Sequence, residues 1–243
     1  MKNVYLILGA GSEVAMTYIE RILAYEKDKI IIACYRNTSE RLEQIFADAD
    51  VIPVSADLSD DSQVRKIIEF ADGEGLLPTH ILHTASGPYE FIRTKNWDLD
   101  KASEHMQISL YSFARICSAY LPRMAKAGRG NVVAVLSSVV LGTPPACTGM
   151  YTAAKYALMG YVRSLAAEYA DKGLNINSVS PGMMKTGFLD SIDERIVEMN
   201  TTGCRRKRLI TVQETVDAIE FLMSDKASYI NGENINLSGG DYM

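Results

Sequence analysis

The chain has 243 residues, of which 47% are hydrophobic and 23% are charged, and its formal net charge at pH 7 is −5. This composition is typical of a globular domain with a sizeable core, and it excludes a fibrous or a disordered chain. It also argues against binding to the phosphate backbone of nucleic acids, because such proteins carry an excess of Lys and Arg.

Cysteine usage and hydrophobic run length indicate the cellular compartment. The four cysteines are far apart and form no CxxC pair, which is typical of reduced thiols. The longest apolar stretch, residues 132–141, is much shorter than the roughly 20 residues of a membrane helix, and the N-terminus has no signal-peptide core. Neither cysteines nor histidines fall at metal-ligand spacing. We therefore expect a cytoplasmic protein without a metal or a membrane segment.

Short apolar runs alternate with amphipathic stretches along the whole chain. The expected strands are Asn3–Leu8, Lys29–Cys34, Val51–Val54, His80–Thr84, Asn131–Leu136, Asn175–Val179 and Asn234–Leu237. The expected helices are Glu13–Glu26, Ser39–Asp48, Asp61–Ala71, Asp98–Met124, Tyr151–Ala170 and Gln213–Met223. This order predicts one α/β domain over residues 1–243, a doubly wound parallel sheet of the Rossmann type with helices on both faces. The irregular segment 186–210 is expected to be a lid on the substrate side.

The loop after the first strand is a glycine turn that opens a helix. Its candidate cofactor-binding residues are Gly9, Gly11, Ser12, Glu13 and Val14. A turn of this kind presents backbone N–H groups and the positive end of a helix dipole to a phosphate. The acidic residue of an NAD site is absent after the second strand, where Arg36 and Asn37 stand instead. Because a guanidinium binds a 2′-phosphate, the sequence favours NADP(H) over NAD(H).

Three further residues have the pattern of a carbonyl-reducing site. Tyr151 and Lys155 lie at i and i+4, on one face of the expected helix, and Ser138 ends the preceding strand. A neighbouring ammonium group lowers the pKa of a phenol, and a serine hydroxyl polarises a carbonyl oxygen. The sequence therefore predicts hydride transfer to a ketone, with Tyr151 as the proton donor.

With the segments 177–182 and 230–240, these motifs resemble the short-chain dehydrogenase/reductase family over essentially the whole chain. Segments 208–214 and 224–230 are most similar to its 3-oxoacyl-[acyl-carrier-protein] reductases. The resemblance implies that Ser138 orients the carbonyl and that Lys155 both tunes the phenol and binds the nicotinamide ribose. It also implies that the cofactor is held by Asp57, Leu58, Ala85, Ser86, Pro181, Gly182, Met184 and Thr186.

The chain departs from the family pattern at three places. Glu13 replaces a glycine of the turn, and we expect its side chain to point outward. At the position where the family has the helical asparagine of its catalytic set, this chain has Ser109. Whether Ser109 supports a proton relay is therefore left open by the sequence. The family's Asn-Asn-Ala-Gly loop is His83-Thr84-Ala85-Ser86, and we expect His83 to be a buried structural residue.

Several alternatives remain open from the sequence. Segment 107–113 resembles enoyl-[acyl-carrier-protein] reductases, but their Tyr–Lys spacing would put the tyrosine at Thr148, so ketone reduction is preferred. Reduction of a sugar or another small ketone is one alternative, and a dinucleotide-binding regulator without turnover is the alternative from another class. The run Arg205–Arg208 fits either a solvated surface or recognition of an anionic, carrier-bound substrate.

The expected helix after the fifth strand carries more apolar side chains than one core face uses. They are Tyr156, Leu158, Met159, Val162 and Leu165. We therefore expect a homo-oligomer, either a dimer or a tetramer.

Overall fold

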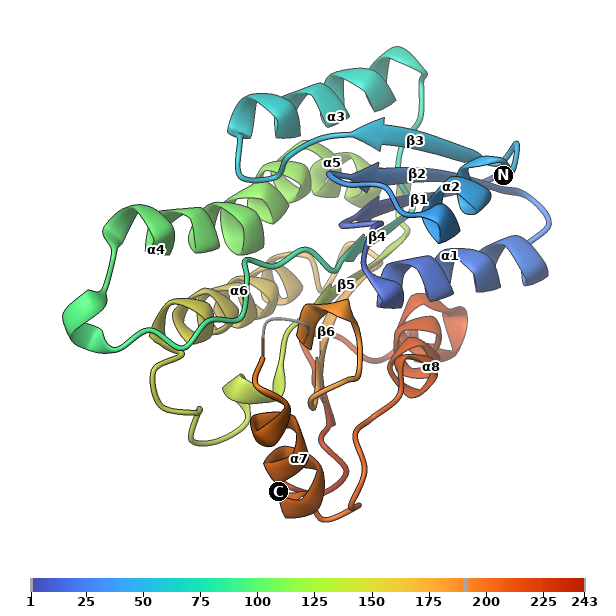
Figure 1. Cartoon of the computed structure of the whole chain (residues 1–243). Coiled ribbons are helices and arrows are strands. Elements are labelled where there is room, and N and C mark those ends of the chain that lie inside the picture. The colour runs from blue at the N-terminus through green and yellow to red at the C-terminus, as the bar shows by residue number, and fades with distance from the viewer. Residues whose placement is uncertain (1, 190–191, 243) are drawn as a thin grey trace.

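The computed structural model describes residues 2–189 and 192–242, and these form a single seven-stranded parallel sheet (Figure 1). The strands are β1 Asn3–Leu8, β2 Lys29–Tyr35, β3 Val51–Ser55, β4 His80–His83, β5 Gly130–Val135, β6 Leu174–Pro181 and β7 Asn234–Leu237. Their order in the sheet is β3-β2-β1-β4-β5-β6-β7. The predicted doubly wound parallel sheet is confirmed, and each expected strand is present.

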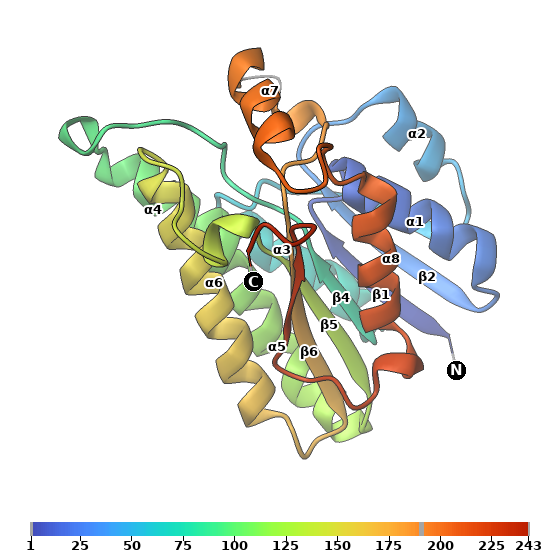
Figure 2. The ribbon, with the colours of Figure 1, turned by 90° about the horizontal axis from the view of Figure 1, so that it is seen from below.

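Helices cover the sheet on both faces (Figure 2). One layer contains α1 Glu13–Tyr25, α2 Glu40–Phe46 and α8 Val212–Met223; the other contains α3 Asp61–Gly73, α4 Leu99–Met106, α5 Ser112–Ala127 and α6 Gly149–Glu168. Successive side chains of a strand point to opposite faces of the sheet. In β1, Tyr5 and Ile7 pack toward α1. Leu6 and Leu8 pack toward α5. Burial on both faces explains why the strands are almost continuously apolar.

The helix predicted over Asp98–Met124 is interrupted in the structure. Between α4 and α5 the residues Gln107–Tyr111 form a π-helical turn, in which Ser109 is completely buried. The hydroxyl of Ser112 donates to the Ile108 carbonyl at 2.7 Å within this region. Such turns leave backbone carbonyls with altered partners and occur frequently at functional sites.

The segment 186–210 is more regular than its sequence indicates. It contains a short 3₁₀ turn, Gly187–Leu189, and the helix α7 Glu194–Gly203, capped by the Asp193 side chain at 2.9 Å from the Arg195 amide. α7 buries no side chain completely, and its apolar residues Ile196 and Val197 are only half-buried. It lies beyond the carboxyl edge of the sheet, where the loops after the strands converge (Figures 1 and 2).

Candidate active site

Two adjoining cavities lie at the carboxyl edge of the sheet. The larger has a volume of about 400 Å³ and the smaller about 270 Å³. Gly11, Ser12, Thr84, Ser86 and Phe188 line both, so the two cavities form one continuous crevice. Parallel sheets bind their ligands at this edge.

The crevice brings together nearly all residues that the sequence singles out. Gly11, Ser12, Glu13, Val14, Ser86, Ser138, Tyr151, Lys155, Pro181, Gly182, Met184 and Thr186 line the larger cavity. Gly9, Gly11, Ser12, Arg36, Asn37, Asp57, Leu58, Ala85 and Ser86 line the smaller one. Ser109 is outside the described lining of both cavities.

The glycine turn has the geometry of a phosphate cradle. Gly9 adopts a φ of +87°, and a Cβ at this position would lie 2.8 Å from the Ala85 amide nitrogen and from the Thr84 hydroxyl. Ser12 caps α1 by accepting from the Ala15 amide at 3.1 Å, and its hydroxyl donates to Thr84 at 2.9 Å. Because the backbone at Gly9 passes so close to Thr84 and Ala85, this position requires glycine. The tight turn also directs the first N–H groups of α1 toward the crevice. These features fit a dinucleotide phosphate.

The expectation for Glu13 is wrong. Its carboxylate does not point away from the turn but accepts a hydrogen bond from the Gly187 amide at 2.9 Å. The bond joins the glycine turn to the start of segment 186–210, and both residues line the larger cavity. An anion that uses the Gly187 amide must therefore displace this carboxylate.

Arg36 is among the residues that line the smaller cavity, whose described lining does not include Tyr151. Its guanidinium is 3.8 Å from the Asp57 carboxylate, and the two side chains are 57% and 32% exposed. A long ion pair at this exposure is weak, so the guanidinium can exchange this partner for a phosphate at little cost.

Tyr151 and Lys155 lie on the first turns of α6 and are both buried. The Lys155 ammonium donates to the Val135 carbonyl at 2.8 Å and lies 5.7 Å from the centroid of the Tyr151 ring. Burial of the ammonium lowers the pKa of Lys155 to about 7. Near neutral pH the side chain is therefore present in both its protonated and its neutral form.

Lys155 by itself does not produce the lowered pKa that the sequence predicts for Tyr151 beside a cation and an oxidised nicotinamide. Burial raises the pKa of the phenol to about 12, and the hydroxyls of Ser137 and Ser86 act in the opposite direction. Desolvation outweighs these bonds because the phenolate is buried beside aromatic rings. A phenol that keeps its proton at pH 7 is suited to donate it.

Aromatic side chains that the sequence does not single out surround Tyr151. Tyr89 meets its ring edge-on at a centroid distance of 4.9 Å, and Phe188 lies at 6.2 Å. Ser137 and Tyr242 also line the larger cavity. Tyr89, Ser137 and Phe188 follow strands of the sheet, and Tyr242 is near the C-terminus. A position after a strand does not by itself indicate that a side chain points into the cavity, so the sequence did not identify these four residues.

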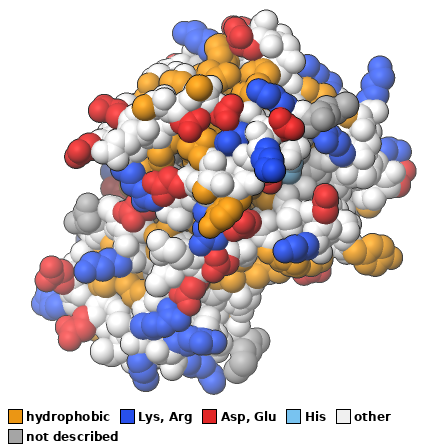
Figure 3. Space-filling view, turned by 90° about the vertical axis from the view of Figure 1, so that its right-hand side faces the viewer, with side chains coloured by type: hydrophobic (Ala, Val, Ile, Leu, Met, Phe, Trp, Pro, Cys, Tyr) orange, Lys and Arg blue, Asp and Glu red, His pale blue; other side chains and the backbone are white. Residues whose placement is uncertain are grey.

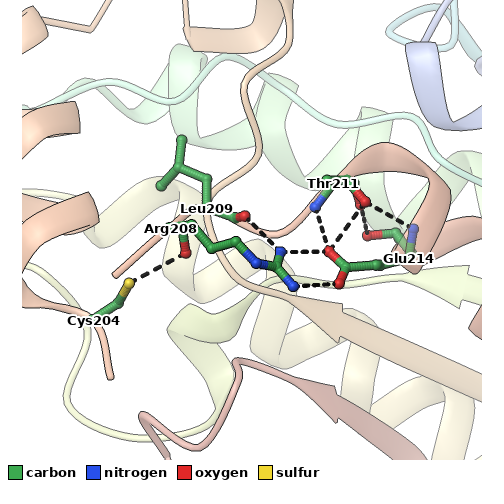
Figure 4. A network of polar contacts seen from close by, with 6 residues as sticks. Cys204, Arg208, Leu209, Thr211 and Glu214 are labelled. Atoms are coloured by element: carbon green, nitrogen blue, oxygen red, sulfur yellow. Dashed lines mark hydrogen bonds and ion pairs between the residues drawn. The ribbon is translucent and has the colours of Figure 1, made fainter. Parts of the chain in front are cut away.

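The basic run 205–208 is partly neutralised. Figure 4 shows the Arg208 guanidinium facing both carboxylate oxygens of Glu214, at 2.8 and 2.6 Å. The Lys207 ammonium donates to the Thr202 carbonyl at 2.8 Å, and the stem of Arg206 packs against Gly239. Lys and Arg side chains gather at the lower end of the face in Figure 3, but both signs of charge alternate over the rest of it. The run is therefore a weaker anion site than its sequence indicates.

No helix in the described part of the chain has the length and hydrophobicity needed to cross a membrane.

Residues 10–241 match the family described as enoyl-(acyl carrier protein) reductase. The chain is 32% identical over 152 residues to a 3-oxoacyl-[acyl-carrier-protein] reductase of Buchnera aphidicola subsp. Acyrthosiphon pisum; the match covers 63% of this chain and 60% of that protein. It is 27% identical to the Salmonella typhimurium enzyme of the same name, over 99% and 98% of the two chains. The solved structure "4-hydroxyisoleucine dehydrogenase complexed with NADH" has a TM-score of 0.90, 23% identity and coverage of 98% of each chain.

A family match over nearly the whole chain confirms the resemblance read from the motifs, and the parallel sheet agrees with it. This chain belongs to the short-chain dehydrogenase/reductase family.

Proposed function

We propose that the protein reduces a ketone to an alcohol with NADPH, and that Tyr151 donates the proton. The observation that carries this proposal is the buried phenol, held in its protonated form beside Lys155 and two serine hydroxyls, in one crevice with the glycine turn. The bound nicotinamide supplies the hydride. The chain supplies the proton and holds the carbonyl oxygen that receives it.

Each side chain has a distinct task in this proposal. The phenol of Tyr151 transfers its proton to the carbonyl oxygen as negative charge develops there. Ser138 and Ser137, which both line the larger cavity, are the hydroxyls that can hold the same oxygen. Lys155 lies beside the ring, where its positive charge favours the phenolate that forms, and its lowered pKa lets it release and regain a proton near pH 7. The substrate chain lies against the aromatic walls formed by Tyr89 and Phe188.

We propose a 3-oxoacyl thioester as the substrate, with a sugar or another small ketone as the alternative. The reductases to which the chain is similar are named for this substrate, and the larger cavity has apolar walls beside Tyr151. The enoyl reductase alternative needs a tyrosine where Thr148 stands. Thr148 instead donates to the Pro145 carbonyl at 2.7 Å and supplies no phenol, so ketone reduction fits better.

The test is the rate of NADPH and NADH oxidation with an acetoacetyl thioester, a crotonyl thioester and a panel of small ketones. Oxidation of NADPH that requires the acetoacetyl thioester is the expected result. Turnover of the crotonyl thioester instead would assign the enoyl reaction. Tight NADPH binding without turnover of any carbonyl would favour the dinucleotide-binding regulator.

Arg36→Ala is expected to weaken NADPH binding by about tenfold and to leave NADH binding nearly unchanged, because a charge-assisted hydrogen bond to the 2′-phosphate is lost. Dissociation constants of both cofactors measured by fluorescence check this. Arg41→Ala is the matched control, since Arg41 pairs with Glu20 at 2.6 Å, outside the described lining of the crevice. Equal losses for both cofactors would remove Arg36 from the 2′-phosphate site.

We also propose a cytoplasmic homo-oligomer, a dimer or a tetramer. The four cysteines are free thiols, as a reducing compartment requires. Leu158, Val162 and Leu165 belong to the core, so the outward apolar surface of this layer is smaller than its sequence indicates. Tyr111 and Tyr156 remain 51% and 41% exposed there.

A further inference from the structure

The hydrogen bond between Glu13 and Gly187 connects two walls of the larger cavity. Glu13 is the first residue of α1, and Gly187 is the first residue of the 3₁₀ turn Gly187–Leu189. The carboxylate of Glu13 accepts from the Gly187 amide at 2.9 Å, and within the described residues this amide has no second acceptor. The position of residues 186–189 against the glycine turn therefore depends on this carboxylate.

The Glu13 carboxylate stands where an anion is favoured. It belongs to the first turn of α1, whose unpaired N–H groups and positive dipole end attract negative charge. No ion pair joins it to a basic side chain in the described part of the chain. The same helix end is the cradle that fits a dinucleotide phosphate. A carboxylate of the chain and a phosphate of the cofactor are thus two anions suited to one place.

The bond also sets the place of Phe188, the next residue in the chain. Phe188 lines both cavities, and its ring centroid lies 6.2 Å from that of Tyr151 and 6.4 Å from that of Tyr89. A dinucleotide with its adenosine end at Arg36 and its nicotinamide beside Tyr151 must pass the residues that line both cavities. The contact between Glu13 and Gly187 therefore holds an aromatic side chain on the path of the cofactor.

We propose that Glu13 competes with the pyrophosphate of the cofactor, so that the carboxylate must leave the Gly187 amide before a dinucleotide binds. The inference rests on the proposed use of a nicotinamide dinucleotide by this crevice. In the free protein the carboxylate occupies the Gly187 amide and keeps residues 186–189 closed against the glycine turn. The negative charge of Glu13 also repels a bound phosphate and favours release of the cofactor.

This competition lowers the apparent affinity for the cofactor. When only a fraction of a protein is in the form that binds, its apparent dissociation constant rises by the inverse of that fraction, so a closed form that is favoured by about tenfold weakens binding by about tenfold. The pyrophosphate is common to NADPH and NADH. The effect of Glu13 is therefore the same for both cofactors, whereas that of Arg36 is confined to NADPH.

Two substitutions separate the hydrogen bond from the charge. Alanine at position 13 removes both, whereas glutamine removes the charge and keeps an oxygen that accepts from the Gly187 amide. We expect Glu13→Ala to lower the dissociation constants of NADPH and NADH by about tenfold each, with a faster association rate, because the closed form is lost. Glu13→Gln is expected to lower both constants by about threefold, since only the repulsion is removed. Fluorescence titration and stopped-flow mixing measure these values.

Glu20→Gln is the matched control. Glu20 lies on the same helix and loses the same charge, but it pairs with Arg41 at 2.6 Å, outside the described lining of the crevice. Its substitution is expected to keep both dissociation constants within about twofold of the wild-type values. A Glu13→Ala variant whose constants are unchanged or larger would overturn the proposal.

Hydrogen exchange of the free protein provides a readout that needs no cofactor. Gly187 is exposed, and its amide is protected by the bond to Glu13. Peptides that contain Gly187 are expected to exchange about fivefold faster or more at this amide in Glu13→Ala, and at nearly the wild-type rate in Glu13→Gln. Equal rates in the alanine variant and the wild type would overturn the closed form. A protein that binds NADPH but reduces no ketone would contradict the proposed function alone, because neither readout depends on turnover.

Discussion

Tyr151→Phe is expected to lower kcat for ketone reduction by about 100-fold to 10,000-fold, the usual contribution of a positioned proton donor. The substitution removes only the phenol oxygen and leaves the ring in contact with Tyr89 and Phe188. Binding of NADPH is therefore expected to stay close to that of the wild-type protein. Single-turnover kinetics with the acetoacetyl thioester, combined with NADPH titration by fluorescence, measures both quantities.

Tyr120→Phe is the matched control for this experiment. Tyr120 is as buried as Tyr151, but its hydroxyl faces the Ile68 carbonyl at 3.4 Å, on the α5 side of the core. Its removal is expected to leave kcat unchanged. A Tyr151→Phe variant that keeps kcat within a few-fold of the wild-type value would show that another group donates the proton. A variant that loses NADPH binding would show that Tyr151 acts mainly on the cofactor.

The sheet was predictable because its strands are buried on both faces. A run such as Val132–Val135 has one plausible environment, the centre of a parallel sheet, and helices of ordinary periodicity lie between such runs. The order of these elements then places the loops at the carboxyl edge. For this reason the sequence also places most candidate site residues around one crevice.

The parts that were not predictable depend on tertiary contacts. The π-helical turn has no periodicity signal of its own, and it coincides with the hydrogen bond between His83 and the Ser109 carbonyl. α7 is mostly polar, and its apolar residues Ile196 and Val197 are only half-buried, so its composition resembles that of a loop. The direction of Glu13 depends on Gly187, a residue 174 positions away in the chain. The pKa of Tyr151 depends on how deeply α6 and the aromatic side chains bury it, and spacing along the helix does not contain that information.

Lys155→Met is expected to lower kcat by about 100-fold or more and, at pH 6, to raise the free energy of unfolding. Methionine fills a similar volume, and the substitution removes the buried ammonium that donates to the Val135 carbonyl. Lys29→Met is the matched control. Lys29 is also buried, but it pairs with Asp50 at 3.2 Å, so its removal is expected to lower stability and leave kcat unchanged.

The Lys155→Met variant and the wild-type protein are expected to differ in stability by an amount that depends on pH, and this dependence identifies the cause of the difference. The pKa of Lys155 is lowered from 10.5 to about 7 by burial, so between these two values the unfolded chain binds more protons than the folded one. The free energy of unfolding of the wild-type protein therefore increases as the pH rises through this window, by about 1.4 kcal/mol per pH unit. The methionine variant has no ammonium at this position, so its stability lacks this increase with pH. Urea unfolding of both proteins at pH 6, 8 and 10 is expected to show a difference that is largest at pH 6 and smallest at pH 10. A difference that is independent of pH would show that packing, and not the buried charge, separates the two proteins.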